Sequence, residues 1–432
     1  MMWIHPDDRP AILEKLRIKA RADYNARIPV NPLDEEHRRV LIRAINNVLS
    51  TEEAILTYAQ IIDGLPTADV AWDRRIPGLY GEHPLEEHEE LCPGALDKAR
   101  EVCPQWTIEM LSFDPKPVHA FQDAAPGTKM FNTRLIEMVA VSLHQFAVLL
   151  HQLEFRLHKG KDIDAVTNWM EPTPDYAAKF ENWQPWKPPP TIFNHPFYLD
   201  HDIYPDGIAD MVGYWAEDHI LGGVVVFDRR AELDEHGEFI MTQEQQENLP
   251  NIYLHPCRNK VTMLVTQLLD HQQQALIDFL LAADSATAKT SCPLPILVDD
   301  RNRVRYKNED AIIFHRIYRD VWERSPIDKE ERKREGRRPQ STLDYPGVLL
   351  TMLNINLVTG DPLPEKQRRY LDGEEDINDD DYNDGGAWRR ALDEFKERFG
   401  WEKKNRDMKM LPKGSSWIKI RGKKGRNWMV KM

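Results

Sequence analysis

The strongest constraint on the fold comes from the stretch between Tyr204 and Ala283, where a compact polar turn leads into apolar segments. Leu221 to Phe227 is an unbroken apolar run rich in β-branched residues, which predicts a strand buried on both faces. Asn251 to His255 is a shorter candidate strand that would pair with it. Apolar residues at helical spacing from 261 to 280 predict a long helix with one stripe against these strands.

Further helices are predicted before this stretch. Asp34 is a candidate N-cap for a helix that continues through Val48. The segment from Ser50 to Glu53 matches a capping box, and apolar residues at helical spacing continue to Ile62. The same spacing from Leu135 to Leu157 predicts a second long helix, which would pack against the helix at 261–280.

The segments after the stretch predict shorter elements. Apolar residues 294–298 and 304–306 flank a turn-forming Asp299 to Asn302 segment, which predicts a hairpin. Ala311 to Glu323 has helical spacing. Between residues 172 and 196, closely spaced prolines and tryptophans predict an extended segment, because consecutive prolines exclude a helix.

Together these elements predict an α+β fold: a mainly helical body with two long amphipathic helices, a small β-sheet and a charged C-terminal appendage. We divide the chain into a helical region (1–170), a Pro/Trp-rich strap or linker (171–200), an α+β core (201–325), a polar and acidic linker region (326–386) and a basic tail with a β-hairpin (387–432).

The composition indicates an acidic, soluble protein. Charged residues make up 30% of the 432 residues, and the formal net charge is −14, so the surface as a whole would repel nucleic acid and anionic membranes. We expect no membrane-spanning segment, because no apolar run is long enough, and no secretory signal at the start. Four cysteines without CxxC pairing favour a reducing compartment, the cytoplasm or the nucleus.

Two polar patterns are candidates for metal chemistry. His195, His201 and Asp202 lie close together in the sequence and could bind a divalent metal. Glu137, His144, His151 and His158 recur every seven residues on one predicted helix. That spacing separates successive side chains by about 10 Å, too far for one ion, so we interpret them as a polar stripe.

Other catalytic motifs are absent from the sequence. Neither a nucleotide-binding glycine motif (GxGxxG or GxxxxGK[ST]) nor the hydrolase motifs HExxH and GxSxG occur. No cofactor is firmly implied.

The C-terminal region has strongly segregated charges. Residues 372–384 contain eight acidic and no basic residues, whereas residues 401–432 carry a net charge of +9. Alternating residues on both sides of a Gly-Lys-Lys-Gly turn predict a two-stranded hairpin. Its basic and aromatic residues are candidate contacts for nucleic acid or for an acidic partner, which includes the acidic block itself. They are Trp417, Lys419, Arg421, Lys423, Lys424, Arg426 and Trp428.

A family resemblance concerns roughly residues 195–325. The segments that carry it are Gly213 to Asp218, Leu221 to Arg229, Tyr253 to Pro256, Leu268 to Leu281, Pro293 to Ile296 and Ile317 to Glu323. Their pattern is similar to one found in a family of uncharacterised proteins of filamentous fungi. The resemblance implies no activity and no catalytic residues.

The function expected from the sequence is that of a non-catalytic intracellular protein that acts through protein contacts, since strong catalytic motifs are absent and the tail charges are segregated. Two alternatives remain open. One is a metal-dependent enzyme centred on the His/Asp cluster near residues 195–210, and the other is a nucleic-acid contact through the basic hairpin.

Overall fold

The structure is a computed structural model that describes residues 26–72, 83–153, 156–170, 188–229, 252–258, 261–283, 291–299 and 301–320, together with the backbone of residues 417–421 and 427–431. Most of the predicted strap and all of the predicted linker at 326–386 lie outside the described residues.

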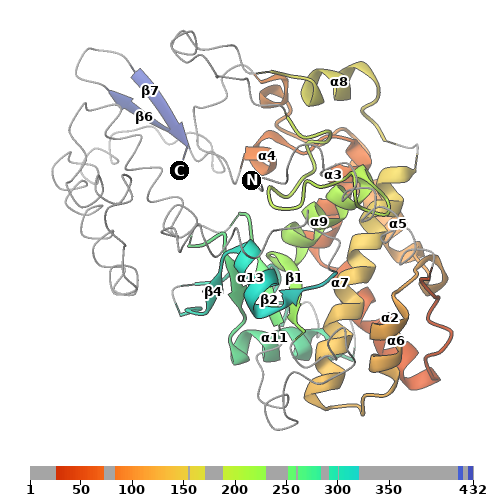
Figure 1. Cartoon of the computed structure of the whole chain (residues 1–432). Helices are drawn as coiled ribbons and strands as arrows, with labels where there is room; N and C mark the ends of the chain where they lie inside the picture. Colours follow the sequence, from red (N-terminus) through yellow and green to blue (C-terminus); the bar gives the residue numbers. More distant parts are fainter. Residues whose placement is uncertain are drawn as a thin grey trace, which may run out of the picture.

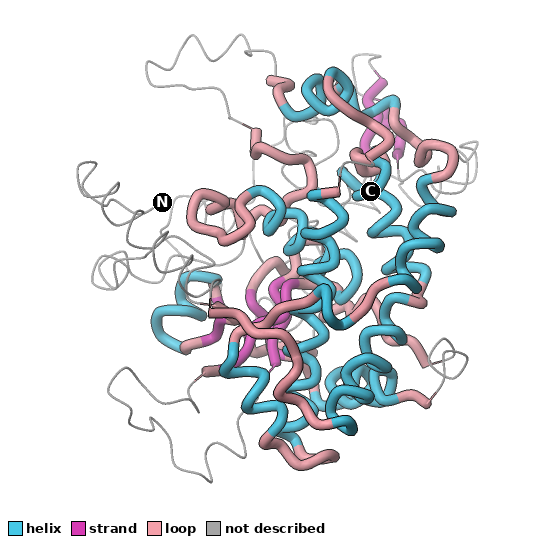
Figure 2. The backbone as a smooth tube through the Cα atoms, turned by 90° about the vertical axis from the view of Figure 1, so that its right-hand side faces the viewer, coloured by secondary structure: helices cyan, strands magenta, loops and turns pink. Residues whose placement is uncertain are grey.

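Within these ranges a helical body lies beside a small antiparallel sheet, which confirms the predicted α+β fold (Figures 1 and 2). Three short 3-10 helices occupy Pro84–Glu87, Cys103–Gln105 and Ile108–Met110. The α-helices are α2 (Glu35–Leu49), α3 (Glu52–Asp63), α4 (Ala68–Trp72), α5 (Ala95–Val102), α6 (Pro115–Gln122), α7 (Lys129–Gln152), α8 (Lys161–Thr167), α9 (Ile208–Leu221), α11 (Asp270–Leu281) and α13 (Asn308–His315).

The sheet has five antiparallel strands in the order β4-β3-β2-β1-β5. Val225 pairs with Leu254 in its centre, and every residue of β1 is buried, as the apolar run predicts. A separate antiparallel hairpin joins β6 and β7, which confirms the predicted C-terminal hairpin at the level of the backbone. The strands are β1 (Val224–Asp228), β2 (Ile252–His255), β3 (Val265–Gln267), β4 (Arg305–Tyr306), β5 (Ile317–Tyr318), β6 (Trp417–Arg421) and β7 (Asn427–Lys431).

Local signals place the N-terminal helices correctly. The Asp34 side chain accepts a hydrogen bond from the His37 amide at the start of α2, as expected of an N-cap. Helix α3 begins one residue later than its capping box suggests, because Thr51 and not Ser50 accepts the amide hydrogen bond from Ala54. The long helix predicted from residue 135 is α7.

The buried helix α9 was not expected. The sequence indicates a polar turn before residue 221, yet residues 208–221 are helical and all 13 residues from Ala209 to Leu221 are buried. A helix that is buried all round has no polar face, so its sequence lacks the amphipathic period by which helices are recognised. Leu221, the first residue of the predicted strand, is the last residue of α9, so β1 begins only at Val224.

Three further predictions are wrong in detail. The helix predicted at 261–280 begins only at Asp270, since the β-branched pair Val265 and Thr266 forms β3 against β2 and β4. The hairpin predicted at 294–306 does not form, because β4 pairs with β3. The helix predicted at 311–323 ends at His315, where the chain turns to place β5 beside β1.

Helix α7 is the centre of the helical body, and it packs most extensively on α9 and not on α11 as predicted. Helices α2 and α6 also lie beside it (Figure 1). By length and composition α7 could cross a membrane, but 83% of its most apolar window is buried inside the protein. Its apolar character therefore matches its place in the core.

A buried ion-pair network connects α7 to the sheet. Glu137 of α7 accepts hydrogen bonds from Arg134 and from Arg229, which follows β1, both at 2.5 Å. Arg229 also donates to the backbone oxygens of Tyr318 and Arg319. Burial favours the neutral acid, but the two arginines outweigh it and lower the pKa of Glu137 to about 2.

We expect this network to make the fold sensitive to acid. Because the pKa of Glu137 lies below its ordinary value of 4.5, the unfolded state binds more protons between pH 4.5 and about 2. The stabilisation by Glu137 is therefore present above pH 4.5 and is lost as the pH falls through that window. Urea unfolding over this pH range measures the loss. A Glu137→Gln variant should be less stable at neutral pH but depend less steeply on pH, and an unchanged pH slope would contradict the assignment.

Candidate metal centre

The structure places the residues of the predicted metal cluster in different surroundings. His195 is fully buried, and its Nε2 lies 3.0 Å from the backbone oxygen of His255. His201 is partly exposed, and its Nδ1 lies 3.9 Å from Asp202 Oδ1. Within the described ranges, two groups of His, Cys, Asp or Glu bring their ligand atoms within 4.8 Å of one another, and neither includes His201 or Asp202.

The first group joins His195 to Asp218 of α9 and to Cys257, and all three side chains are buried. Asp218 accepts hydrogen bonds from the Cys257 amide at 3.0 Å, from Cys257 Sγ at 3.2 Å and from Arg258 Nε at 2.9 Å. Burial alone would raise the pKa of Asp218, but the Arg258 charge, followed by those of two histidines, lowers it to about 2. Because Arg258 already supplies the compensating cation, we interpret this group as a structural network.

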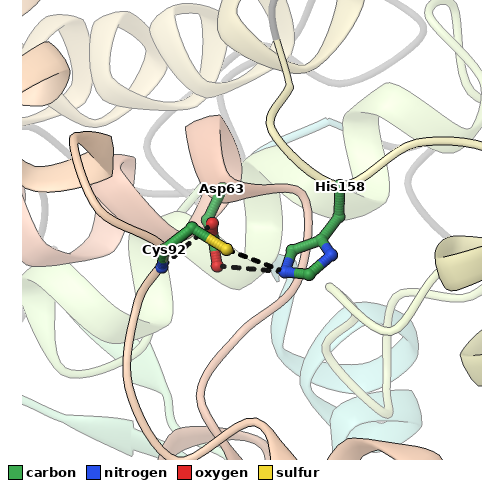
Figure 3. A group of neighbouring side chains, drawn as sticks. All are labelled: Asp63, Cys92 and His158. Carbon is green, nitrogen blue, oxygen red and sulfur yellow. Dashed lines mark hydrogen bonds and ion pairs between the residues drawn. The ribbon is translucent and has the colours of Figure 1, made fainter.

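The second group consists of Asp63, Cys92 and His158, which we call the Asp63 cluster (Figure 3). Cys92 Sγ lies 3.1 Å from His158 Nε2, which in turn lies 4.0 Å from Asp63 Oδ2. Asp63 is fully buried, whereas the side chain of His158 is 22% exposed and Cys92 is half-buried. The three ligand atoms therefore point to one spot near the surface.

Backbone contacts hold the cluster together. Asp63 is the last residue of α3, and Gly64 ends that helix in the left-handed conformation with φ of 97°. The amides of Leu157 and His158 donate to the backbone oxygens of Ile62 and Asp63, at 3.1 and 2.8 Å. A Cβ atom on Gly64 would lie 3.0 Å from the His158 backbone oxygen, so the close approach of the two segments favours glycine there.

Outer contacts orient the candidate ligands. His158 Nδ1 lies 3.4 Å from Asp162 Oδ2, so that Nε2 faces the cluster. His88 Nε2 lies 2.7 Å from Asp63 Oδ2, and the Cys92 amide donates to Asp63 Oδ1 at 3.3 Å. Metal-binding histidines commonly have a carboxylate on their second ring nitrogen, and ligating carboxylates are themselves hydrogen-bonded. The Asp63 cluster shows both features.

The charge of Asp63 is compensated differently from that of three other buried acids, and resembles that of Asp210, which pairs with the His144 imidazole. Glu137, Glu217 and Asp218 each contact an arginine. Asp63 is 0% exposed, but among the residues that the structure describes its side-chain ion-pair partners are the imidazoles of His88 and His158. A buried carboxylate needs a nearby positive charge. The cluster is thus suited to a bound cation.

The distances between the ligand atoms lie close to those of a tetrahedral zinc site, without matching them. Zn–S bonds of about 2.3 Å and Zn–N or Zn–O bonds of about 2.0 Å imply separations of roughly 3.3–3.6 Å between ligand atoms. The separations of 3.1 Å and 4.0 Å lie on either side of that range. Thiolate, imidazole and carboxylate are all ligands that Zn²⁺ accepts, and three protein ligands leave the fourth position open.

Cys92, His158 and Asp162 also have the order of a nucleophile, a base and an orienting carboxylate. Two features disfavour a thiol nucleophile. Burial, with the hydrogen bond and charge of Asp63, raises the pKa of the Cys92 thiol. In addition, the Cys92 amide already donates to Asp63 and is not available to stabilise an oxyanion. A metal would reverse the first effect, since a coordinating thiol is deprotonated.

Sequence reasoning missed this cluster. His88 and Cys92 are four residues apart within an acidic segment, a spacing that is compatible with one metal site, but Cys92 was interpreted only for the redox compartment. His158 was assigned to the histidine stripe, although α7 ends at Gln152. Asp63 gives no signal of its own, because only the fold brings it to the other residues.

Comparison with known proteins adds no family assignment: no family model, no curated protein and no solved structure matches the chain. The resemblance to fungal proteins stays a prediction.

Proposed function

We propose that this protein is a zinc-dependent hydrolase whose metal is held by Asp63, Cys92 and His158. The observation that carries the proposal is the convergence of Cys92 and His158 on the fully buried carboxylate of Asp63. Within the described residues this carboxylate contacts no arginine or lysine. The thiolate and the carboxylate would together neutralise the two charges of Zn²⁺.

The open coordination position supplies the chemistry. Three protein ligands leave room for a water molecule, and Zn²⁺ lowers the pKa of such a water to about 7. Zinc held by these residues would supply an activated water for the hydrolysis of an ester, and the alcohol that leaves would need a proton. His88 is 13% exposed and lies 2.7 Å from Asp63 Oδ2, so it is placed at the rim of the site to carry that proton.

Metal analysis of the purified chain tests zinc binding. We expect one zinc per chain in the wild-type protein and none in His158→Ala, because the variant lacks one of three ligands. Cys92→Ser should also weaken zinc binding. His119→Ala is the matched control, since His119 of α6 is exposed and lies outside the cluster. Wild-type protein that takes up no zinc on titration, or equal zinc in His158→Ala, would overturn the proposal.

Turnover of p-nitrophenyl acetate tests the catalytic part. Zinc-loaded wild-type protein should hydrolyse this ester at least about 100-fold faster than His158→Ala, a factor within the range of metal-assisted catalysis. Stoichiometric zinc without zinc-dependent turnover would limit the site to a structural role and refute the hydrolase assignment.

The other hypotheses concern a different part of the chain. A role through protein contacts, or through nucleic acid, depends on side chains of the C-terminal region that lie outside the described residues. These roles and the cytoplasmic or nuclear location stay predictions. A salt titration of nucleic-acid binding by the full chain tests the nucleic-acid role independently of the zinc proposal. Binding through lysine and arginine contacts to phosphate should weaken steeply as salt is added.

A further inference from the structure

A second candidate site lies on α2, away from the residues of the Asp63 cluster. A pocket of about 350 Å³ is lined by Arg38, Arg39 and Arg43, and Glu35 is the acidic residue in its lining. The wall opposite α2 is formed by Ala283, just after α11. We call it the arginine pocket.

The wall of the pocket is fixed by hydrogen bonds. The Asn47 side-chain amide donates to the backbone oxygens of Phe279, Leu280 and Ala282, at 3.1, 3.3 and 3.1 Å, and so fastens α2 to the end of α11. Asn46 Oδ1 accepts from Trp106 Nε1 at 2.8 Å, which directs the amide nitrogen of Asn46 away from that indole. Helix α2, which carries the three arginines, is therefore fixed in position relative to α11.

The charges of the pocket are incompletely neutralised. Arg38 pairs with Glu109. Among the described residues Arg39 and Arg43 form no ion pair, and Arg43 Nε is buried without a hydrogen-bond acceptor. The chain has 71 acidic and 57 basic residues, so a lining with three arginines and one glutamate departs from its overall charge balance. Guanidinium groups that lack a carboxylate partner are suited to bind an anion from solvent.

We propose that the arginine pocket binds the phosphate group of a small phosphorylated molecule. Guanidinium groups present a planar fork of donors that matches the oxygens of phosphate, and two unpaired arginines match the two charges of a phosphate monoester. A pocket of about 350 Å³ is of the size that small-molecule sites have. Ile42 adds an apolar surface to the lining.

Calorimetric titration of the full chain with inorganic phosphate and with pyrophosphate tests the proposal. We expect saturable binding that weakens at least about tenfold in Arg39→Gln and in Arg43→Gln, since each loses a charged donor. Glu35→Gln should bind more tightly, because it removes a carboxylate from the lining. A misfolded variant would lose phosphate binding, so tighter binding by Glu35→Gln would show that the substitutions act on the pocket and not on folding.

Two controls complete the test. His158→Ala should bind phosphate as the wild-type protein does, which excludes phosphate on a zinc ion as the source. Arg100→Gln, on the exposed face of α5, should also leave binding unchanged. Absence of saturable binding, or equal weakening by Arg100→Gln and Arg43→Gln, would overturn the proposal.

Discussion

Replacement of Gly213 by alanine is expected to destabilise the protein by about 3 kcal/mol, at the upper end of the cost of overpacking a core. Gly213 lies in the middle of α9, and a Cβ atom there would lie 2.5 Å from the His144 ring of α7. The ring cannot move freely, because His144 is buried with Nε2 at 2.9 Å from Asp210 and Nδ1 at 2.9 Å from Glu217. Urea unfolding measures the change.

A double-mutant cycle checks this cause. His144→Ala removes the ring, so Gly213→Ala should cost at least about 1 kcal/mol less in the His144→Ala background than in the wild type. In a helix, alanine is favoured over glycine by about 1 kcal/mol, but this gain is the same in both backgrounds and cancels in the comparison. Equal costs in the two backgrounds would show that the His144 ring is not what makes alanine unfavourable at position 213.

Arg229→Met is expected to destabilise the protein by about 3–5 kcal/mol, the usual cost of removing one partner from a buried ion pair. Arg229 is buried and donates to Glu137 at 2.5 Å. Its loss leaves the Glu137 carboxylate buried with Arg134 alone, and two backbone oxygens near β5 lose their donor. The free energy of unfolding at neutral pH measures this cost.

An exposed ion pair supplies the matched control. Arg301 donates to Asp299 at 2.6 Å, but its side chain is 71% exposed, so Arg301→Met should cost less than about 1 kcal/mol. Similar costs for the two variants would mean that burial does not set the strength of the Glu137 network.

The sequence predicts those elements of the fold whose signals are local. The start of α2 follows from Asp34 as N-cap, and α7 follows from apolar residues at helical spacing. Helix α9 could not be found in this way, since it is buried all round. Residues 265–267 continue the apolar pattern of α11, and only pairing with β2 and β4 makes them a strand.

The candidate site was less accessible to sequence reasoning than the fold. His195, His201 and Asp202 are neighbours in the chain, but the structure brings His195 to Asp218 and Cys257 instead. The Asp63 cluster joins residues up to 95 positions apart, from Asp63 to His158. Its separate parts are an ordinary helix end, a cysteine without a CxxC partner and a histidine after α7.

The sequence by itself determined the fold class, the main amphipathic helices, the buried strand and the C-terminal hairpin. Periodicity, capping and turn composition act between residues a few positions apart, so they can be read without knowledge of tertiary contacts. The tertiary structure alone decided that α9 is a buried helix, that Asp63, Cys92 and His158 converge, and that the arginines of α2 line a pocket. Burial and convergence depend on contacts between distant segments, and no local pattern records those contacts.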